Sequence, residues 1–169
     1  MTDTYLKRDS TTGRVAEQTA TVTGGTVGQA GKIVGLDSSG RLDPTIMPVG
    51  VVADTYSGTA GEALVAGDLV YINASGNVVR ASAASGGNDA MGFVLTNVNN
   101  AASALVYLEG RNTALSSLTV GSRYYLSDST PGGITDTPVT GSGKRHQYVG
   151  KAITTTSLSF EADDGILLA

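Results

Sequence analysis

Short runs of Val, Ile, Tyr and Leu, separated by clusters of Gly, Asn and Ser, fill the chain from Val49 to its end. The run DLVYIN at residues 68–73, for example, is followed by ASGN at residues 74–77. Branched and aromatic residues favour extended strands, whereas Gly, Asn and Ser favour the turns that join them. The pattern therefore predicts an all-β fold of short strands.

The second half of this region resembles the first. VAGDLVYI at residues 65–72 is similar to VGSRYYL at residues 120–126, with Gly67 matching Gly121 and Tyr71 matching Tyr125 at the same spacing. Repeats of this kind indicate one structural unit used twice, although any chain rich in Val, Gly and Tyr looks partly self-similar.

We expect this duplication to cover residues 60–110 and 115–169. Each copy would form an antiparallel meander that exposes half a core. Two similar meanders could then close on each other into a single compact barrel-like or sandwich-like body over residues 49–169.

The N-terminal residues 1–30 lack a sustained apolar period, and residues 19–31 are rich in Gly and Thr. Such a segment buries too little apolar surface to fold alone, so we expect an extended N-terminal arm. Thr and Val favour pairing of this arm with a strand of a neighbour, and a disordered tail without a role is the alternative. The candidate contact residues of the arm are Tyr5, Leu6, Lys7, Arg8, Val15, Val22 and Val27.

A joint segment over residues 31–48 follows the arm. The sequence DSSG at residues 37–40 predicts a turn, because Asp and Ser bond their own backbone and Gly40 tolerates a positive φ. Pro44 and Pro48 exclude a long helix and an inner strand. We expect a rigid connection between the arm and the body.

Charge argues against two classes of partner. The chain has 15 acidic and 11 basic residues and a net charge of −4. It therefore lacks the excess of basic residues with which proteins bind nucleic acids and anionic membranes. Charged residues make up 15% of the chain, below the quarter that is usual for soluble domains. Neutral polar residues or a partner must therefore cover much of the surface, which favours an assembly.

The sequence also suggests where the protein is made. It has no cysteine, which excludes disulfides and fits a reducing cytoplasm. Its first residues lack the apolar core of a signal peptide, and no apolar run approaches the roughly 20 residues of a membrane helix.

Residues with catalytic potential do not form a recognisable motif. His146 is the only histidine and no G-x-S-x-G motif accompanies it, so we expect a surface residue. Asp37 and Asp43 lack the other ligands of a calcium loop. Glu161, Asp163 and Asp164 are expected in a solvated turn. We expect no enzymatic activity, no cofactor and no bound metal.

Four tyrosines lie within the expected strands, namely Tyr71, Tyr107, Tyr124 and Tyr125. Tyrosines in strands pack in cores or at subunit contacts, and we expect these roles here. The sequence shows no cluster of aromatic residues of the kind that lines a glycan-binding groove.

The sequence AGEALVAGDLVYINASGNVVRASA at residues 60–83, followed by AMGFV at residues 90–94, resembles small phage capsid decoration (cement) proteins. The resemblance covers about half the chain. It implies a barrel-like body, often a homotrimer, seated on the outer surface of the virion, and an arm that pairs with strands of the major capsid protein. The apparent second copy makes this body longer than is usual in the family. Residues 31–48 also resemble segments of phage fibre proteins, so a head or tail fibre or receptor-binding component is the alternative.

Overall fold

The computed structural model describes residues 4–9, 11–24, 32–47 and 53–169. The chain divides into two units, Met1–Val52 and Ala53–Ala169, and each is described by itself. Apart from one short 3-10 turn, all regular structure in the described residues consists of β-strands in antiparallel sheets. The all-β prediction is therefore confirmed.

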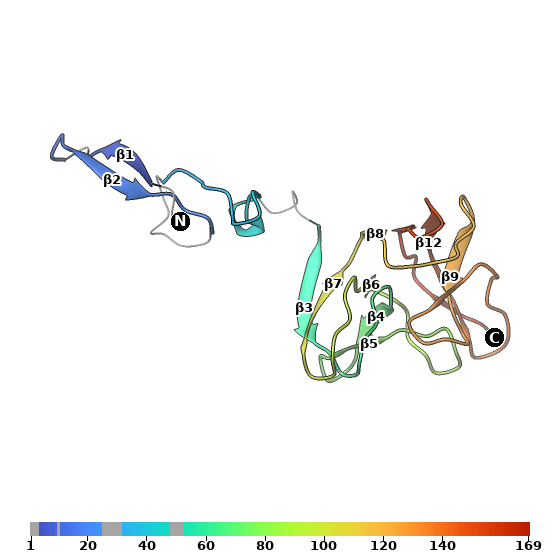
Figure 1. Ribbon diagram of the computed structural model, residues 1–169. Helices are drawn as coiled ribbons and strands as arrows, with labels where there is room; N and C mark the ends of the chain where they lie inside the picture. Colours follow the sequence, from blue (N-terminus) through green and yellow to red (C-terminus); the bar gives the residue numbers. More distant parts are fainter. Residues whose placement is uncertain (1–3, 10, 25–31, 48–52) are drawn as a thin grey trace. The chain divides into compact units, whose positions relative to one another are not determined.

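The first unit begins with a β-hairpin, drawn in blue in Figure 1. Strand β1 (Thr4–Arg8) pairs antiparallel with β2 (Val15–Thr19). The turn is held by Asp9, whose Oδ1 accepts hydrogen bonds from the backbone N–H groups of Thr11 at 2.8 Å and Thr12 at 2.6 Å. The extended arm expected from sequence is thus folded back on itself over these residues, because this Asx turn reverses the chain.

The rest of the described first unit has little regular structure. Thr21 and Val34 form a single parallel bridge, and Pro44–Ile46 form a 3-10 turn labelled η2. The expected turn at residues 37–40 is present, since Gly40 N–H bonds to Asp37 O at 3.0 Å and Gly40 has a φ of 72°. Asp37 Oδ1 also accepts a hydrogen bond from the Arg41 N–H.

The described side chains of the first unit include no buried apolar residue. Its large apolar side chains that are exposed are Leu6, Val15, Val22, Ile33, Val34, Leu36 and Leu42. An isolated two-stranded hairpin is at best marginally stable in water, because burial of apolar surface provides most of the stability of a sheet. The first unit therefore lacks a core among its described residues.

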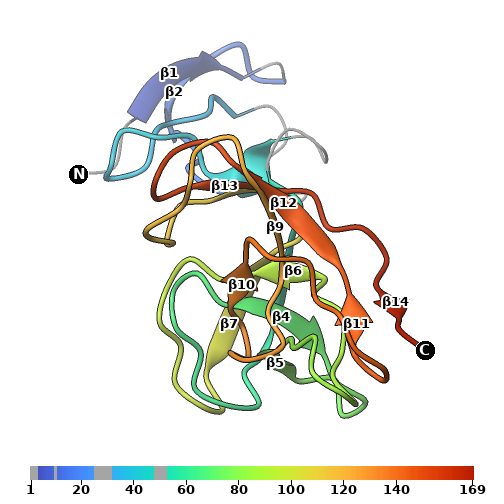
Figure 2. The ribbon, with the colours of Figure 1, turned by 90° about the vertical axis from the view of Figure 1, so that its right-hand side faces the viewer.

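The second unit contains two five-stranded antiparallel sheets (Figure 2). The first sheet consists of β3 (Thr55–Thr59), β4 (Leu69–Ile72), β5 (Val78–Arg80), β6 (Gly92–Phe93) and β7 (Ser103–Tyr107), in the order β3-β7-β6-β4-β5. The second sheet consists of β8 (Gly110–Asn112), β9 (Arg123–Leu126), β10 (Ile134–Thr135), β12 (Tyr148–Ala152) and β13 (Leu158–Phe160), in the order β8-β13-β12-β9-β10. Strands β11 (Arg145–His146) and β14 (Ile166–Leu167) pair separately.

The two sheets share one strand order and one register. In both, the last strand along the chain lies beside the first, which distinguishes them from a simple up-and-down meander. Val70 lies opposite Gly92 in the first sheet, and Tyr124 lies opposite Gly150 in the second. The matching glycines before β4 and β9 also agree, with a φ of 98° at Gly67 and 83° at the second copy's Gly121. Each half of the body is thus one version of the same strand arrangement.

The main core is built from both sheets. Phe93 of the first sheet lies 5.3 Å from Phe160 of the second, ring centre to ring centre, and 5.5 Å from Tyr107. The buried residues of this shared core are Leu69, Ala81, Ala83, Ala90, Phe93, Leu118, Tyr124, Leu126, Val139, Val149, Ala152, Leu158 and Phe160. A smaller cluster, on the other side of the first sheet, contains Ala60, Leu64, Val70, Val78, Val94, Val98, Ala104 and Val106.

Matching positions of the two sheets differ in burial. Leu69 and Phe93 lie opposite each other in the first sheet and are buried in the shared core. Arg123 and Lys151 take the same ladder position in the second sheet and are exposed. The central strands β4 and β6 of the first sheet are therefore covered on both faces, whereas the second sheet keeps one face polar.

Buried polar groups tie the halves together as well. Asn112 Nδ2 donates to Gly67 O at 2.9 Å. The side-chain amide of Gln147 pairs with the backbone of Ala90 in both directions, at 2.7 and 2.8 Å. Because an unpaired buried polar group costs free energy, these bonds fix how the two halves meet.

Replacing Phe93 by alanine tests whether the halves depend on one core. We expect Phe93→Ala to lower the free energy of unfolding by about 3–5 kcal/mol, since it removes a buried ring and leaves a cavity. Leu105→Ala is the matched control, because Leu105 lies in the same sheet with an exposed side chain, and it should change the value by about 0.5 kcal/mol or less. Urea denaturation followed by circular dichroism measures both, and equal midpoints for the two variants would contradict a shared core.

Candidate functional site

The N-terminal hairpin presents an apolar face. In its register Leu6 lies opposite Glu17 and Val15 lies opposite Arg8, which places all four side chains on one side of the ribbon. Leu6 is 74% exposed and Val15 is 65% exposed. We call this surface, with its two apolar side chains flanked by Arg8 and Glu17, the hairpin face.

The opposite side of the hairpin meets its own unit. The Tyr5 hydroxyl accepts a hydrogen bond from the Ile33 N–H at 3.2 Å, and Tyr5 is half-buried. Lys7 shares this side because side chains alternate along a strand. Among the predicted contact residues, the structure thus brings Leu6, Arg8 and Val15 together and places Tyr5 and Lys7 behind them.

The hairpin also has open edges. Strands β1 and β2 pair only with each other in the part of the chain that the structure describes. Each strand therefore keeps an edge of backbone N–H and C=O groups, which can template pairing with another strand. Of the remaining predicted contact residues, Val22 is exposed and follows the Thr21 bridge, and Val27 lies outside the described residues.

Three of the four predicted tyrosines belong to the core of the body. Tyr124 is buried, and its hydroxyl accepts a hydrogen bond from the Thr119 N–H at 2.9 Å. Tyr107 stacks on Phe93, and Tyr71 packs half-buried against the shared core. These side chains provide packing.

Tyr125 has a different environment. Its ring centre lies 5.0 Å from that of His146 and 6.1 Å from that of Tyr148. The Arg123 guanidinium carbon lies 5.9 Å from the centre of the Tyr148 ring, within the range of a cation–π contact. Together with Asp163, Asp164 and Ile166, these residues line a hollow of about 400 Å³, which we call the tyrosine hollow.

The strand register of the second sheet explains how the tyrosine hollow forms. Arg123 and Tyr125 alternate with the buried Tyr124, so both face away from the shared core. A bulge at Val149 brings Tyr148 opposite Tyr125. The sequence shows no aromatic cluster because Tyr125 and Tyr148 are far apart along the chain and meet only across the β9–β12 ladder.

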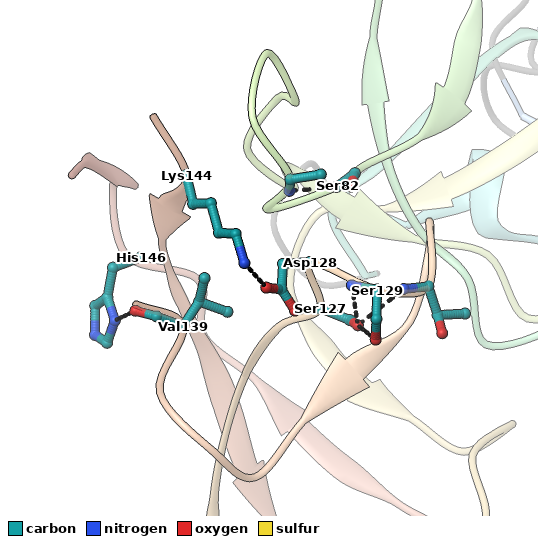
Figure 3. Close-up of polar contacts among 9 residues, drawn as sticks. Ser82, Ser127, Asp128, Ser129, Val139, Lys144 and His146 are labelled. Carbon is teal, nitrogen blue, oxygen red and sulfur yellow. Dashed lines mark hydrogen bonds and ion pairs between the residues drawn. The ribbon is translucent and has the colours of Figure 1, made fainter. Parts of the chain in front are cut away.

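Hydrogen bonds hold the walls of the tyrosine hollow in place. The Asp163 N–H bonds to Tyr148 O at 3.0 Å, and Gln147 Nε2 bonds to Asp163 O at 2.9 Å. These two bonds anchor the chain after β13 as a rim of the hollow. His146, which also lines the hollow, bonds through its imidazole to Val139 O, and Lys144 forms an ion pair of 2.6 Å with Asp128. Both contacts are drawn in Figure 3.

The hydrogen-bonding roles of two rings in this region follow from their contacts. His146 Nδ1 lies 3.2 Å from Val139 O, and because a carbonyl oxygen only accepts, Nδ1 donates this bond. Burial raises the pKa of the Tyr148 phenol, and the Glu161 charge raises it further, against the opposing effect of Arg123. Tyr148 therefore remains a hydrogen-bond donor at neutral pH.

In residues 4–9, 11–24, 32–47 and 53–169, no three or more His, Cys, Asp or Glu residues are placed to hold a metal ion. Within the same residues, no helix has the length and apolar character to cross a membrane.

No protein-family model and no curated protein matches this chain. Functional inference therefore depends on the two surfaces just described, the hairpin face and the tyrosine hollow.

Replacing Tyr148 by phenylalanine tests the electrostatics of the hollow. We expect the tyrosinate absorbance that Tyr148→Phe removes to develop at higher pH than that of tyrosine in a short peptide, because burial and Glu161 raise the pKa of this phenol. Spectrophotometric titration of both proteins gives the difference, while circular dichroism monitors the fold. A difference curve at or below the peptide's titration would contradict the described environment.

Proposed function

We propose that this chain is a non-enzymatic structural protein of a phage particle. It decorates the outside of the capsid, binds the major capsid protein through its N-terminal unit and stabilises the shell. The proposal combines the family resemblance of residues 60–94 with the physical character of the two units.

The observation that carries the proposal is the missing core of the first unit. The body buries an extensive apolar core of its own, whereas the described part of the N-terminal unit buries no apolar side chain and exposes seven large ones. Contiguous exposed apolar surface marks sites of protein association. A partner that covers the hairpin face would supply the burial that this unit lacks.

The form of the hairpin favours strand addition as the mode of binding. Its open edges offer backbone hydrogen bonds, while Leu6 and Val15 offer apolar contacts on alternate positions of the same face. Main-chain bonds provide affinity in this mode, and pockets for alternate side chains provide specificity. Arg8 and Glu17 at the same face would set register through opposite charges.

Copy number would strengthen these contacts. In a homotrimer three N-terminal units would bind a shell together, and each would raise the effective concentration of the others. Individually weak contacts could then resist the outward pressure of packaged DNA. After synthesis in the host cytoplasm the protein would reside on the exterior of the virion.

A second candidate function is a head or tail fibre or receptor-binding component. The tyrosine hollow favours it, because an aromatic-lined recess suits a receptor ligand better than a shell contact. The two functions separate in binding assays, since a decoration protein sediments with empty shells and a receptor-binding component sediments with host cells.

Charged substitutions on the hairpin face test the decoration proposal. Leu6→Glu combined with Val15→Glu should weaken sedimentation with undecorated capsids of its own phage by roughly 100-fold or more, because two carboxylates would be buried without partners. Val120→Glu is the matched control, since Val120 is 59% exposed in the body. It should bind as the wild type does.

The double variant should retain the circular dichroism and the unfolding midpoint of the body, since both positions are exposed and belong to the other unit. Capsid binding that survives the double substitution would refute docking through the hairpin face. Failure of the wild-type chain to bind capsids, combined with binding to host cells, would favour the fibre alternative.

A further inference from the structure

The tyrosine hollow lies on the one sheet face that the repeated architecture leaves uncovered. The corresponding face of the first sheet, with Leu69 and Phe93, is buried in the shared core. At the matching ladder position the second sheet has Arg123 and Lys151, and it retains Tyr125 where the first sheet has Tyr71. An exposed sheet face therefore carries an aromatic side chain among charged ones.

The ring geometry of the hollow leaves aromatic surface accessible. The planes of Tyr125 and Tyr148 meet at 73°, and those of Tyr125 and His146 meet at 46°. Rings at such angles meet edge to face or tilted, without stacking face to face. Tyr125 and Tyr148 are half-buried, which fixes their orientation while part of each ring stays exposed.

The polar groups around these rings are of complementary kinds. The carboxylates of Asp163 and Asp164 accept hydrogen bonds, and the Arg123 guanidinium donates them. His146 Nε2 offers one further polar contact, because Nδ1 bonds to Val139 O. A ligand for this hollow should thus have an apolar face for a tyrosine ring and several hydroxyl groups for the rim.

Pyranose sugars have this combination, with one face of C–H groups and a perimeter of hydroxyls. The volume of about 400 Å³ suits one or two sugar rings, near the lower end of ordinary ligand pockets. Two acidic side chains against one guanidinium disfavour a phosphate or another anion. We propose that the tyrosine hollow binds a neutral saccharide, with Tyr125 and Tyr148 against the sugar and Asp163 and Arg123 bound to its hydroxyls.

This inference concerns the body alone and goes beyond capsid decoration. A saccharide site on the body would let a particle adhere to a glycan-coated surface while the N-terminal unit holds the protein in place. The site and the hairpin face lie in different units, so each can be inactivated by substitutions that leave the other unchanged.

The test uses the full chain and a panel of neutral oligosaccharides built from glucose, galactose, mannose and N-acetylglucosamine. Isothermal titration calorimetry should detect at least one binder. Tyr148→Ala and Tyr125→Ala should each weaken its binding by about tenfold or more, through loss of the ring contact. Asp163→Asn, which keeps the shape of the side chain and removes its charge, should weaken binding by a similar factor.

Tyr56→Ala is the matched control, because Tyr56 is an exposed tyrosine of β3 outside the hollow, and it should leave saccharide affinity unchanged. Unfolding midpoints identify any variant that has lost its fold. Asp163 is exposed, so the saccharide affinity of Asp163→Asn depends least on packing. Absence of binding across the panel, or unchanged affinity in both Tyr148→Ala and Asp163→Asn, would each overturn the proposal. Capsid sedimentation of the same variants should equal that of the wild type, which separates this result from the test of decoration.

Discussion

The contact between Phe93 and Phe160 is the point on which the architecture of the body depends. These two rings join the face of one five-stranded sheet to the inner side of the other, and the remaining core residues fill the space around them. The first half has a separate apolar cluster on the other side of its sheet, whereas the buried apolar side chains of the second half all lie in the shared core. The second half therefore needs the first for its hydrophobic stabilisation.

The packing of the halves is unequal although their topology is the same. The first half supplies its outer face to the core of the second, so the two do not meet through identical surfaces. Such head-to-tail packing could continue indefinitely if every copy had the same outer face. The charged Arg123 and Lys151 end the series, in the way that polar terminal repeats cap a solenoid. The two copies therefore differ at this position because only the first sheet has another sheet packed against that face.

Much of the fold was predictable from local sequence. Gly67 and Gly121 can be matched by their sequence context alone, because both precede a strand of branched and aromatic residues, and both adopt the positive φ that glycine favours. The N-terminal hairpin was missed because its turn depends on Asp9 and two threonines, without the Asn-Gly or Asp-Gly pair that marks most short hairpins. The tyrosine hollow was missed because Tyr124 and Tyr125 look equivalent in sequence. Only the strand register, with its bulge at Val149, decides which of them faces the core.

The Gln147 amide has a further consequence for how this protein can change over evolution. One buried side chain holds the backbone of Ala90 and the backbone of Asp163, so the path of the C-terminal rim is set from beneath and is independent of the rim's own side chains. Substitutions at Asp163, Asp164 or Ile166 can then accumulate without moving the main chain. A substituted rim would therefore present other side chains on the same backbone, held from beneath by Gln147.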